Sequence, residues 1–328
     1  MTSVKSDPAR SIGGGLVVGA YAASPAHQSW DPEAESAFFE ALAAIDGVSA
    51  FELPWTGSIH PHDDAWLHAN FPAGLRAVIT DIPFTMGRLG ANPDFGLASL
   101  DSDGRQAAVR EVAVLRDGVA AFNAAQGREV VGVVELHTAP RGQRGAVGPL
   151  AESLAEIAGW DWGEADLVIE HCDAHSPEHA PEKGFLPLAD ELDAIDESGA
   201  DVGITLNWAR SVIETRDILT ADAHARLAAA RGRLRGVIAS GVAPVETAFG
   251  YPWIDAHLPF AVTEETPSGE PASLMTPELI GQWWQATGGS VWTGVKVGAT
   301  AAMTLQQRIT LVAESVAALR RVSVPTTR

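Results

Sequence analysis

Short apolar runs that read as buried strands alternate along the chain with stretches whose apolar residues recur every three to four positions, as on one face of a helix. The first helix is the clearest: Asp31 caps it, Pro32 occupies its first position, and Gly47 ends it. We expect strands at 15–23, 48–54, 75–83, 130–137, within 165–175, and at 202–208, 235–240 and 291–297. We expect the helices at 31–45, 64–69, 104–125, 149–158, 188–197, 221–233, from 276 past 284, and at 305–319.

Eight strands alternating with helices in 328 residues is the count of a (β/α)8 TIM barrel. We therefore expect one barrel domain over 1–328, with a long loop excursion, 244–276, after the seventh strand. The Gly/Pro-rich stretch 84–102 is expected to be a second long loop, a lid or substrate-binding segment. A doubly wound sheet is the alternative, but its Gly-rich phosphate loop would follow an early strand, whereas Gly13-Gly14-Gly15 precedes the first one.

Composition and charge narrow the class of protein. The formal net charge of -20 disfavours binding to a phosphate backbone, so nucleic acid is not an expected partner. The sequence holds no apolar run of about 18 residues and no signal-peptide core, which predicts a cytoplasmic protein without a membrane span. The single cysteine, Cys172, is expected to be a small core residue. A homo-oligomer remains open.

Titratable residues gather where the predicted strands end. The strand at 130–137 ends in Glu135 and His137, and the next one ends in Glu170 and His171. The carboxyl ends of barrel strands face one mouth, where such enzymes place their chemistry. The mouth is predicted to hold Glu52, Asp81, Glu135, His137, Glu170, His171 or Asp173, Asn207, Ser240 and Lys296. We predict that Glu135, Glu170 and Lys296 are catalytic, although Lys296 could instead form an ion pair with Glu170 or Glu135.

Other side chains near the strand ends suit a sugar. Indole faces stack on sugar rings, so Trp55 and Trp208 are candidates, although a tryptophan is as often part of the core. Arg210 offers guanidinium donors, but it could equally pair with Glu214, four residues on. The predicted substrate-binding residues are Glu52, Trp55, His137, His171, Asp173, Asn207, Trp208, Arg210, Asp255 and His257.

Several segments resemble known families. The chain is similar to the xylose-isomerase-like barrels, a superfamily of sugar isomerases, sugar epimerases and base-excision endonucleases. More closely, it resembles a bacterial family known as domain of unknown function 4862. The segments that carry this closer resemblance are G-A-Y-A-A-S-P, E-L-P-W, E-L-H-T-A-P, I-E-H-C-D-A, K-G-F-L-P-L and N-W-A-R-S-V-I-E.

The superfamily usually binds a divalent metal through Glu, Asp, His and Glu at the ends of strands five to eight, and this pattern is only partly present. Glu170 matches the first ligand, but Asn207, Ser240 and Lys296 stand near the other three. A hard cation prefers anionic oxygens, so these departures speak against Mn or Mg at that place. The ammonium of Lys296 could take over the stabilisation of an oxyanion. A displaced metal site is the alternative, and its residues would be Glu170, His171, Asp173, Asp255 and His257.

Three functions remain open at this stage. The first is an enzyme that abstracts a proton next to the carbonyl of a sugar or oxidised sugar derivative, as an isomerase, epimerase or β-eliminating lyase. The second is a glycoside hydrolase, for which Glu135 fits the acid, but the seventh strand, G-V-I-A-S-G-V, offers no carboxylate. The third is a carbohydrate-binding barrel without catalysis.

Overall fold

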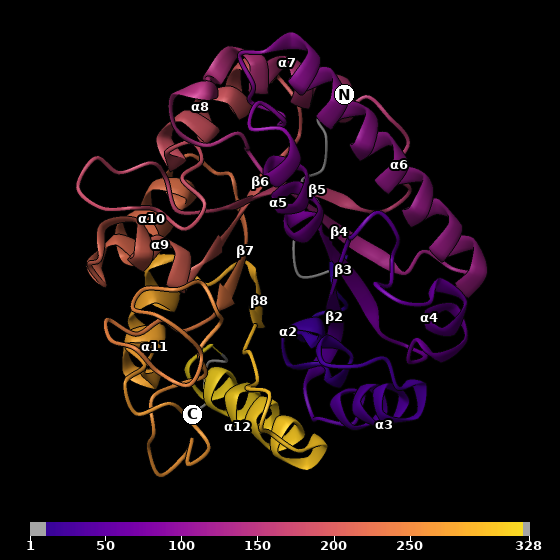
Figure 1. Ribbon diagram of the computed structural model, residues 1–328, viewed down its shortest axis with the longest axis vertical. Coiled ribbons are helices and arrows are strands. Elements are labelled where there is room, and N and C mark those ends of the chain that lie inside the picture. Colours follow the sequence, from indigo (N-terminus) through magenta and orange to yellow (C-terminus); the bar gives the residue numbers. More distant parts are fainter. Residues whose placement is uncertain (1–10, 324–328) are drawn as a thin grey trace.

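Eight parallel strands close into a barrel in the computed structural model, which describes residues 11–323. Each strand pairs with its neighbours in sequence, and β1 also pairs with β8 to complete the ring (Figure 1). The strands are β1 (Leu16–Gly19), β2 (Val48–Pro54), β3 (Arg76–Thr80), β4 (Val131–Leu136), β5 (Asp166–His171), β6 (Gly203–Asn207), β7 (Leu234–Ala239) and β8 (Trp292–Val295). The predicted (β/α)8 architecture is confirmed.

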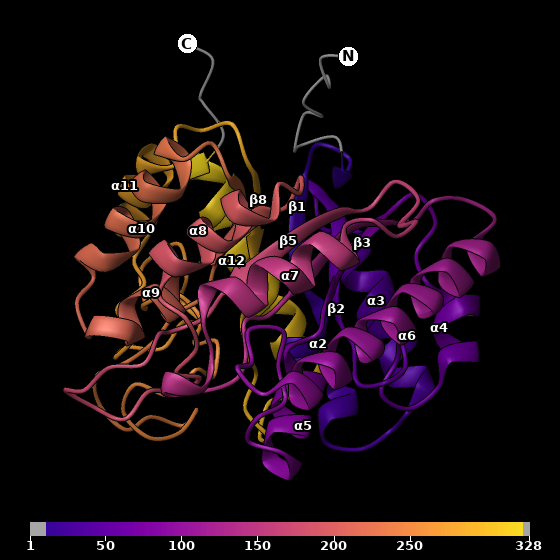
Figure 2. The same ribbon diagram turned by 90° about the horizontal axis from the view of Figure 1, so that it is seen from above.

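Helices surround the barrel on its outside (Figures 1 and 2). They are α2 (Ala20–Ala23), α3 (Pro32–Ala43), α4 (Asp64–Asn70), α5 (Ile82–Ala91), α6 (Ser102–Gln126), α7 (Val147–Ile157), α8 (Leu188–Ser198), α9 (Trp208–Thr215), α10 (Leu219–Ala230), α11 (Pro277–Ala286) and α12 (Leu305–Ser323), with short 3-10 turns at Pro25–His27 and Gly142–Arg144. The last helix, α12, packs against α3 and so closes the outer ring. Within residues 11–323, none of the helices combines the length and the apolar character needed to cross a membrane.

Several boundaries differ from the sequence-based expectation. The strand expected at 15–23 ends at Gly19, and residues 20–23 form helix α2. Residues 82–91 form helix α5, so the strand expected at 75–83 ends earlier, at Thr80, and the loop expected at 84–102 is wrong over residues 84–91. Pro83 fits the first turn of a helix, and Ile82, Thr85 and Leu89 give it a buried side. The strand predicted to run to Trp208 ends at Asn207, because the Asn207 side chain caps α9 by accepting a hydrogen bond from the backbone N–H of the third residue along.

The excursion after β7 contains neither helix nor strand until α11 begins at Pro277, as predicted. It folds back on the barrel through a bridge between Gly241 and Leu258, whose backbone groups exchange two hydrogen bonds of 2.8 and 3.0 Å. This contact brings the residues just before Leu258, including Asp255 and His257, to the carboxyl ends of the strands.

The barrel interior is filled in layers by residues of one parity. The lower layer is apolar and consists of Ile12, Val17, Ala50, Val78, Val133, Val168, Ile238 and Trp292. Residues two positions further along several strands form the next layer, because strand side chains alternate between faces. That layer is polar, and it contains Glu52, Thr80, Glu135, Glu170, Ser240 and Lys296.

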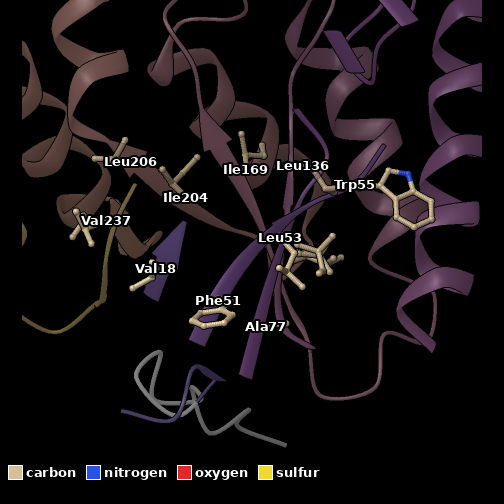
Figure 3. Close-up of a cluster of buried hydrophobic side chains, with 14 of the residues drawn as sticks. Val18, Phe51, Leu53, Trp55, Ala77, Leu136, Ile169, Ile204, Leu206 and Val237 are labelled. Atoms are coloured by element: carbon tan, nitrogen blue, oxygen red, sulfur yellow. The ribbon is translucent and has the colours of Figure 1, made fainter. Parts of the chain in front are cut away.

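Residues of the opposite parity build the main core between the sheet and the helices. Phe51, Leu53, Ile169 and Leu206 belong to this core, and Figure 3 shows them in a cluster of buried hydrophobic side chains. The strands are therefore covered on both faces, as a parallel sheet requires. Polar groups on the inner face must find their partners within the barrel.

Candidate active site at the barrel axis

Two carboxylates and one ammonium meet on the barrel axis. Lys296, just after β8, donates a hydrogen bond of 3.1 Å from Nζ to Oε1 of Glu170 and contacts Oε1 of Glu52. Burial alone would lower the pKa of Lys296, but Glu170 and Glu52 outweigh it and raise that pKa well above its ordinary value. The predicted ion pair with Glu170 is therefore present, whereas the second partner is Glu52 and not Glu135.

The close approach of Lys296 depends on a glycine in β1. A Cβ at Gly19 would lie 2.7 Å from Cγ of Lys296, so any larger residue would displace the lysine. The small residue at the end of the first strand thus makes room for the cation.

Arg210, from the first turn of α9, gives Glu170 a second cation. Its Nη1 lies 2.8 Å from Oε1 of Glu170, and its Nε lies 3.0 Å from Oδ2 of Asp255. The alternative pairing of Arg210 with Glu214 is wrong. Burial raises the pKa of Glu170, but Arg210 and Lys296 outweigh this and hold it well below its ordinary value. Glu170 is therefore ionised.

Asp255 is held between cations, and it anchors the excursion. Nζ of Lys183 lies 2.8 Å from Oδ2 of Asp255, the same oxygen that Arg210 contacts. His257 lies beside it, with Nδ1 3.4 Å from Oδ1 of Asp255 and 3.0 Å from the Ser240 hydroxyl. Burial lowers the pKa of His257 to about 3, so this imidazole is neutral.

His137 connects the axis to β3. Its Nδ1 is 2.5 Å from Oδ1 of Asp81, and its Nε2 is 3.1 Å from Oε2 of Glu170. Burial disfavours the imidazolium, but contacts that include both carboxylates outweigh it and raise the pKa of His137 well above its ordinary value. The Thr80 hydroxyl donates a further hydrogen bond of 3.2 Å to Glu170, so every oxygen of that carboxylate is occupied.

Glu135 differs sharply from Glu170 on the neighbouring strand. Among the described residues, both of its carboxyl oxygens are buried without a hydrogen-bond partner. Burial raises its pKa well above the ordinary value, and the negative charges of Glu170 and Glu52 add to this. Oxygens of Glu52, Glu135 and Glu170 lie within 4.8 Å of one another, so two neighbouring carboxyl groups, Glu135 and Glu170, have pKa values shifted in opposite directions.

Solvent does not reach these groups. Glu52, Glu135 and Lys296 are 0% exposed, and Glu170 is 1% exposed. A cavity of about 290 Å³ opens nearby, at the carboxyl ends of β1 to β3. Tyr21 lines this cavity, and its ring centroid is 5.6 Å from Nζ of Lys296. The tyrosine ring is therefore close to both the cavity and the lysine.

Several predicted site residues lie elsewhere. Trp55 packs against α6, where a Cβ at Gly118 would lie 2.6 Å from its ring, and Trp208 is buried in the outer core. Both indoles are buried in the outer core, which argues against the predicted stacking on a sugar, and Trp55 also lines a small cavity with Asp81 and His137 (Figure 3 shows Trp55 among the core side chains). Asp173 accepts hydrogen bonds from the backbone N–H groups of Lys183 and Gly184 and so holds a loop.

His171 points away from the axis, into the layer between β5 and the helices. Its Nδ1 lies 2.8 Å from Glu191 of α8 and its Nε2 lies 3.1 Å from Glu214 of α9. Its parity is opposite to that of Glu170, so the two cannot share one site. The displaced metal site of Glu170, His171, Asp173, Asp255 and His257 is therefore not assembled.

The sequence matches a described family along most of its length. The model of the family "Domain of unknown function (DUF4862)" matches residues 17–311. The chain belongs to this family. A relative, the "Uncharacterized protein STM3670" of Salmonella typhimurium (strain LT2), is 35% identical over 289 residues, which cover 86% of this chain and 89% of the relative. The closer resemblance inferred from the sequence motifs is confirmed.

Solved structures of xylose-isomerase-like barrels share the fold. D-psicose 3-epimerase in the presence of D-fructose has a TM-score of 0.55 at 14% identity, over 88% of this chain and 93% of that one. A xylose isomerase domain containing protein from Salmonella typhimurium LT2 has a TM-score of 0.55 at 12% identity, over 87% and 92%. IOLI protein with a zinc atom has a TM-score of 0.52 at 11% identity, over 94% and 96%. At these identities the similarity shows the fold.

The barrel axis does not fit the divalent metal that the superfamily implies. Glu52, Glu135 and Glu170 are close enough to share an ion, but two of them are already neutralised by fixed cations. The ammonium of Lys296 lies between Glu52 and Glu170, where an ion would have to bind, and a metal beside it would meet a like charge. The sequence-based expectation that Lys296 replaces a metal at this place agrees with this geometry.

Sequence reasoning missed several residues that the fold brings to the site. Tyr21 lies in the short helix α2, which was expected to be part of the first strand, and Lys183 lies in the loop before α8. The only signal for them was their place in the segments G-A-Y-A-A-S-P and K-G-F-L-P-L that resemble the family. Glu191, Glu214 and His224 lie on helices, where a polar residue is usually solvated.

Proposed function

We propose that this chain is an enzyme that moves a proton next to the carbonyl group of a sugar or oxidised sugar derivative, as an isomerase or epimerase does. The observation that carries the proposal is the pair Glu170 and Glu135, whose neighbouring carboxyl groups have pKa values shifted in opposite directions. Such a pair supplies a base and an acid at the same pH. The likeness in fold to a sugar epimerase supports the substrate class.

The residues on the axis divide the work of proton transfer. Glu170 is ionised, and when the substrate displaces one of the donors that occupy its oxygens in this structure, it accepts the proton from the carbon next to the carbonyl. The electron pair of that C–H bond moves onto the carbonyl oxygen. Lys296 stabilises the negative charge that develops on this oxygen. Glu135 is protonated and returns a proton to the substrate. No metal is required, because the lysine provides the positive charge.

The substrate would bind first in the cavity beside Tyr21. Its volume of about 290 Å³ is close to the lower end for small-molecule sites, about 300 Å³. Its walls offer hydroxyl, imidazole and carboxyl groups to sugar hydroxyls, from Ser24, His27, Glu35 and His60 among others. Movement of the Tyr21 ring would join this cavity to Lys296, and closure behind the substrate would keep water out.

Exchange of substrate hydrogen with solvent tests the proposal. The protein is treated with a chelator and incubated in D2O with ketoses, aldoses and uronates, and proton NMR follows the carbon next to the carbonyl. We expect deuterium to enter at that carbon of at least one sugar, and Glu170→Gln to slow it at least about tenfold, because a neutral amide replaces the base. Exposed Glu152→Gln is the matched control and should exchange like the wild type. No exchange with any sugar would contradict the proposal.

A second function is favoured by the complete burial of the axis. Because the glutamates and Lys296 are shielded from solvent, the barrel could bind a carbohydrate in the cavity without transforming it. This alternative predicts sugar binding that Glu35→Gln weakens, with no deuterium exchange. The glycoside hydrolase interpretation gains no support, since β7 places Ser240 and no carboxylate at the mouth.

A further inference from the structure

A second cluster of imidazoles and carboxylates lies outside the barrel axis, between β5 and the helices. It consists of His171 at the end of β5, Glu214 near the end of α9 and His224 on α10. One ligand atom of each lies within 4.8 Å of the others. Nε2 of His171 is 3.1 Å from Oε2 of Glu214, and Nε2 of His224 is 3.7 Å from Oε1 of the same carboxylate. Both imidazoles thus direct the same nitrogen at one carboxylate.

The other nitrogen of each imidazole is already held. Nδ1 of His171 lies 2.8 Å from the Glu191 carboxylate, which also accepts a hydrogen bond of 2.6 Å from the Thr138 hydroxyl. Nδ1 of His224 lies 3.1 Å from the Ser211 hydroxyl. In metal sites, a hydrogen bond to the far nitrogen fixes the ring and leaves the near nitrogen for the ion.

The charges of the cluster are also unusual. Glu191 is 0% exposed, and the side chain of Glu214 is only 15% exposed. Among the ion pairs of residues 11–323, neither carboxylate contacts a lysine or an arginine, and their charged partners are the imidazoles of His171 and His224. A divalent ion bound by neutral imidazoles would balance the two buried negative charges. This is the opposite of the barrel axis, where fixed cations already provide the balance.

We propose that His171, Glu214 and His224 bind one zinc ion, with Glu191 and Ser211 orienting the two histidines. Two imidazole nitrogens and a carboxylate form one of the ligand sets that zinc uses with an open fourth position. The side chains of Glu214 and His224 are 15% and 13% exposed, so an ion can reach the site from solvent. The ion would join β5, α9 and α10 and is separate from the proton-transfer site proposed above.

Zinc binding to the untagged, chelator-treated full chain tests this proposal. Competition with a chromophoric chelator measures stoichiometry and Kd, and Co²⁺ in place of zinc reports the coordination by its visible absorption. We expect one zinc per chain, a tetrahedral Co²⁺ spectrum and a higher Tm with zinc. His224→Ala should weaken binding more than about 100-fold, and Glu191→Gln about 10- to 100-fold.

The variant and its control are chosen so that misfolding cannot imitate the result. His224 lies on an alanine-rich helix, where alanine is the best helix former, so the variant should keep the wild-type Tm in the absence of zinc. His68→Ala, on α4, removes another partly exposed histidine and should bind zinc like the wild type. Absence of stoichiometric zinc binding, or equal affinity in wild type and His224→Ala, would overturn the proposal. Because the readout is metal binding, failure of the proposed activity would not affect it.

Discussion

Replacement of Lys296 by methionine is the most direct probe of the barrel axis. The wild-type ammonium is 0% exposed and contacts Glu52 and Glu170. Removing it leaves Glu170 with Arg210, whereas Glu52 loses the one cation with which it forms an ion pair among the described residues. Breaking a buried pair by removing one partner typically costs about 3–5 kcal/mol, and we expect Lys296→Met to lose that much unfolding free energy at pH 7.

The pH dependence of that loss identifies its cause. Burial already raises the pKa of Glu52 in the wild type, and loss of Lys296 raises it further. Protonation of Glu52 removes the unpaired charge, so the unfolding free energy lost in Lys296→Met should become smaller as the pH falls. The change should be up to about 1.4 kcal/mol per pH unit, at pH values above the ordinary glutamate pKa.

Urea unfolding at several pH values measures both effects. The double variant Lys296→Met/Glu52→Gln removes both charges and should recover most of the stability at pH 7. Arg88→Met, which breaks an exposed pair with Glu111, is the control and should cost less than about 1 kcal/mol. A loss below about 1 kcal/mol for Lys296→Met, or a loss independent of pH, would refute the reasoning.

Three further predictions concern the interior. The folded pKa of Glu135 is raised, so above about pH 4.3 the folded state holds a proton that the unfolded state has released. The unfolding free energy of the wild type should therefore fall with rising pH by about 1.4 kcal/mol per pH unit, and Glu135→Gln should remove this fall. Parallel urea-derived stability profiles of wild type and variant would contradict this. Trp55→Ala should cost about 3–5 kcal/mol in urea unfolding and leave sugar affinity unchanged, because the ring fills the outer core; weakened sugar binding by the folded variant would return Trp55 to the site. Gly236→Ala should lose about 1–3 kcal/mol, because its Cβ would lie 2.0 Å from the Trp292 ring, and Trp292→Leu in the same chain should relieve part of the loss. An additive double variant would count against that clash.

Residues on strands were predicted well because their environment follows from period-two alternation. Glu135 and Glu170 share the inner face with Val133 and Val168, two positions before them, and Lys296 shares it with Trp292, four positions before it. The same alternation sends His171 outward. The alternation of side chains along the strand therefore already predicts that Glu170 and His171 lie on opposite faces of the sheet. The displaced metal site failed because it combined residues of both parities.

Residues on helices and loops were predicted poorly because their partners come from distant segments. Arg210 and Glu214 are four residues apart on one helix, which suits an ion pair, yet each finds a buried partner of opposite charge on β5. An ion pair with a buried partner is electrostatically stronger than an ion pair with a solvated neighbour on the same helix. Only the packing of the whole chain decides which partner is buried. The same holds for the indole of Trp55, whose strand end gave no indication that its ring turns toward α6.

The sequence by itself determined the barrel, because hydrophobic periodicity, capping residues and the number of strand and helix units are local properties. It also determined that Glu135, Glu170 and Lys296 lie at the same end of the barrel, since parallel strands share a direction. Tertiary structure alone decided their charges, because a pKa depends on burial and on partners far away in the chain. It also decided that His171, Glu214 and His224 meet, since the helices that carry the last two pack beside β5 only in the closed barrel.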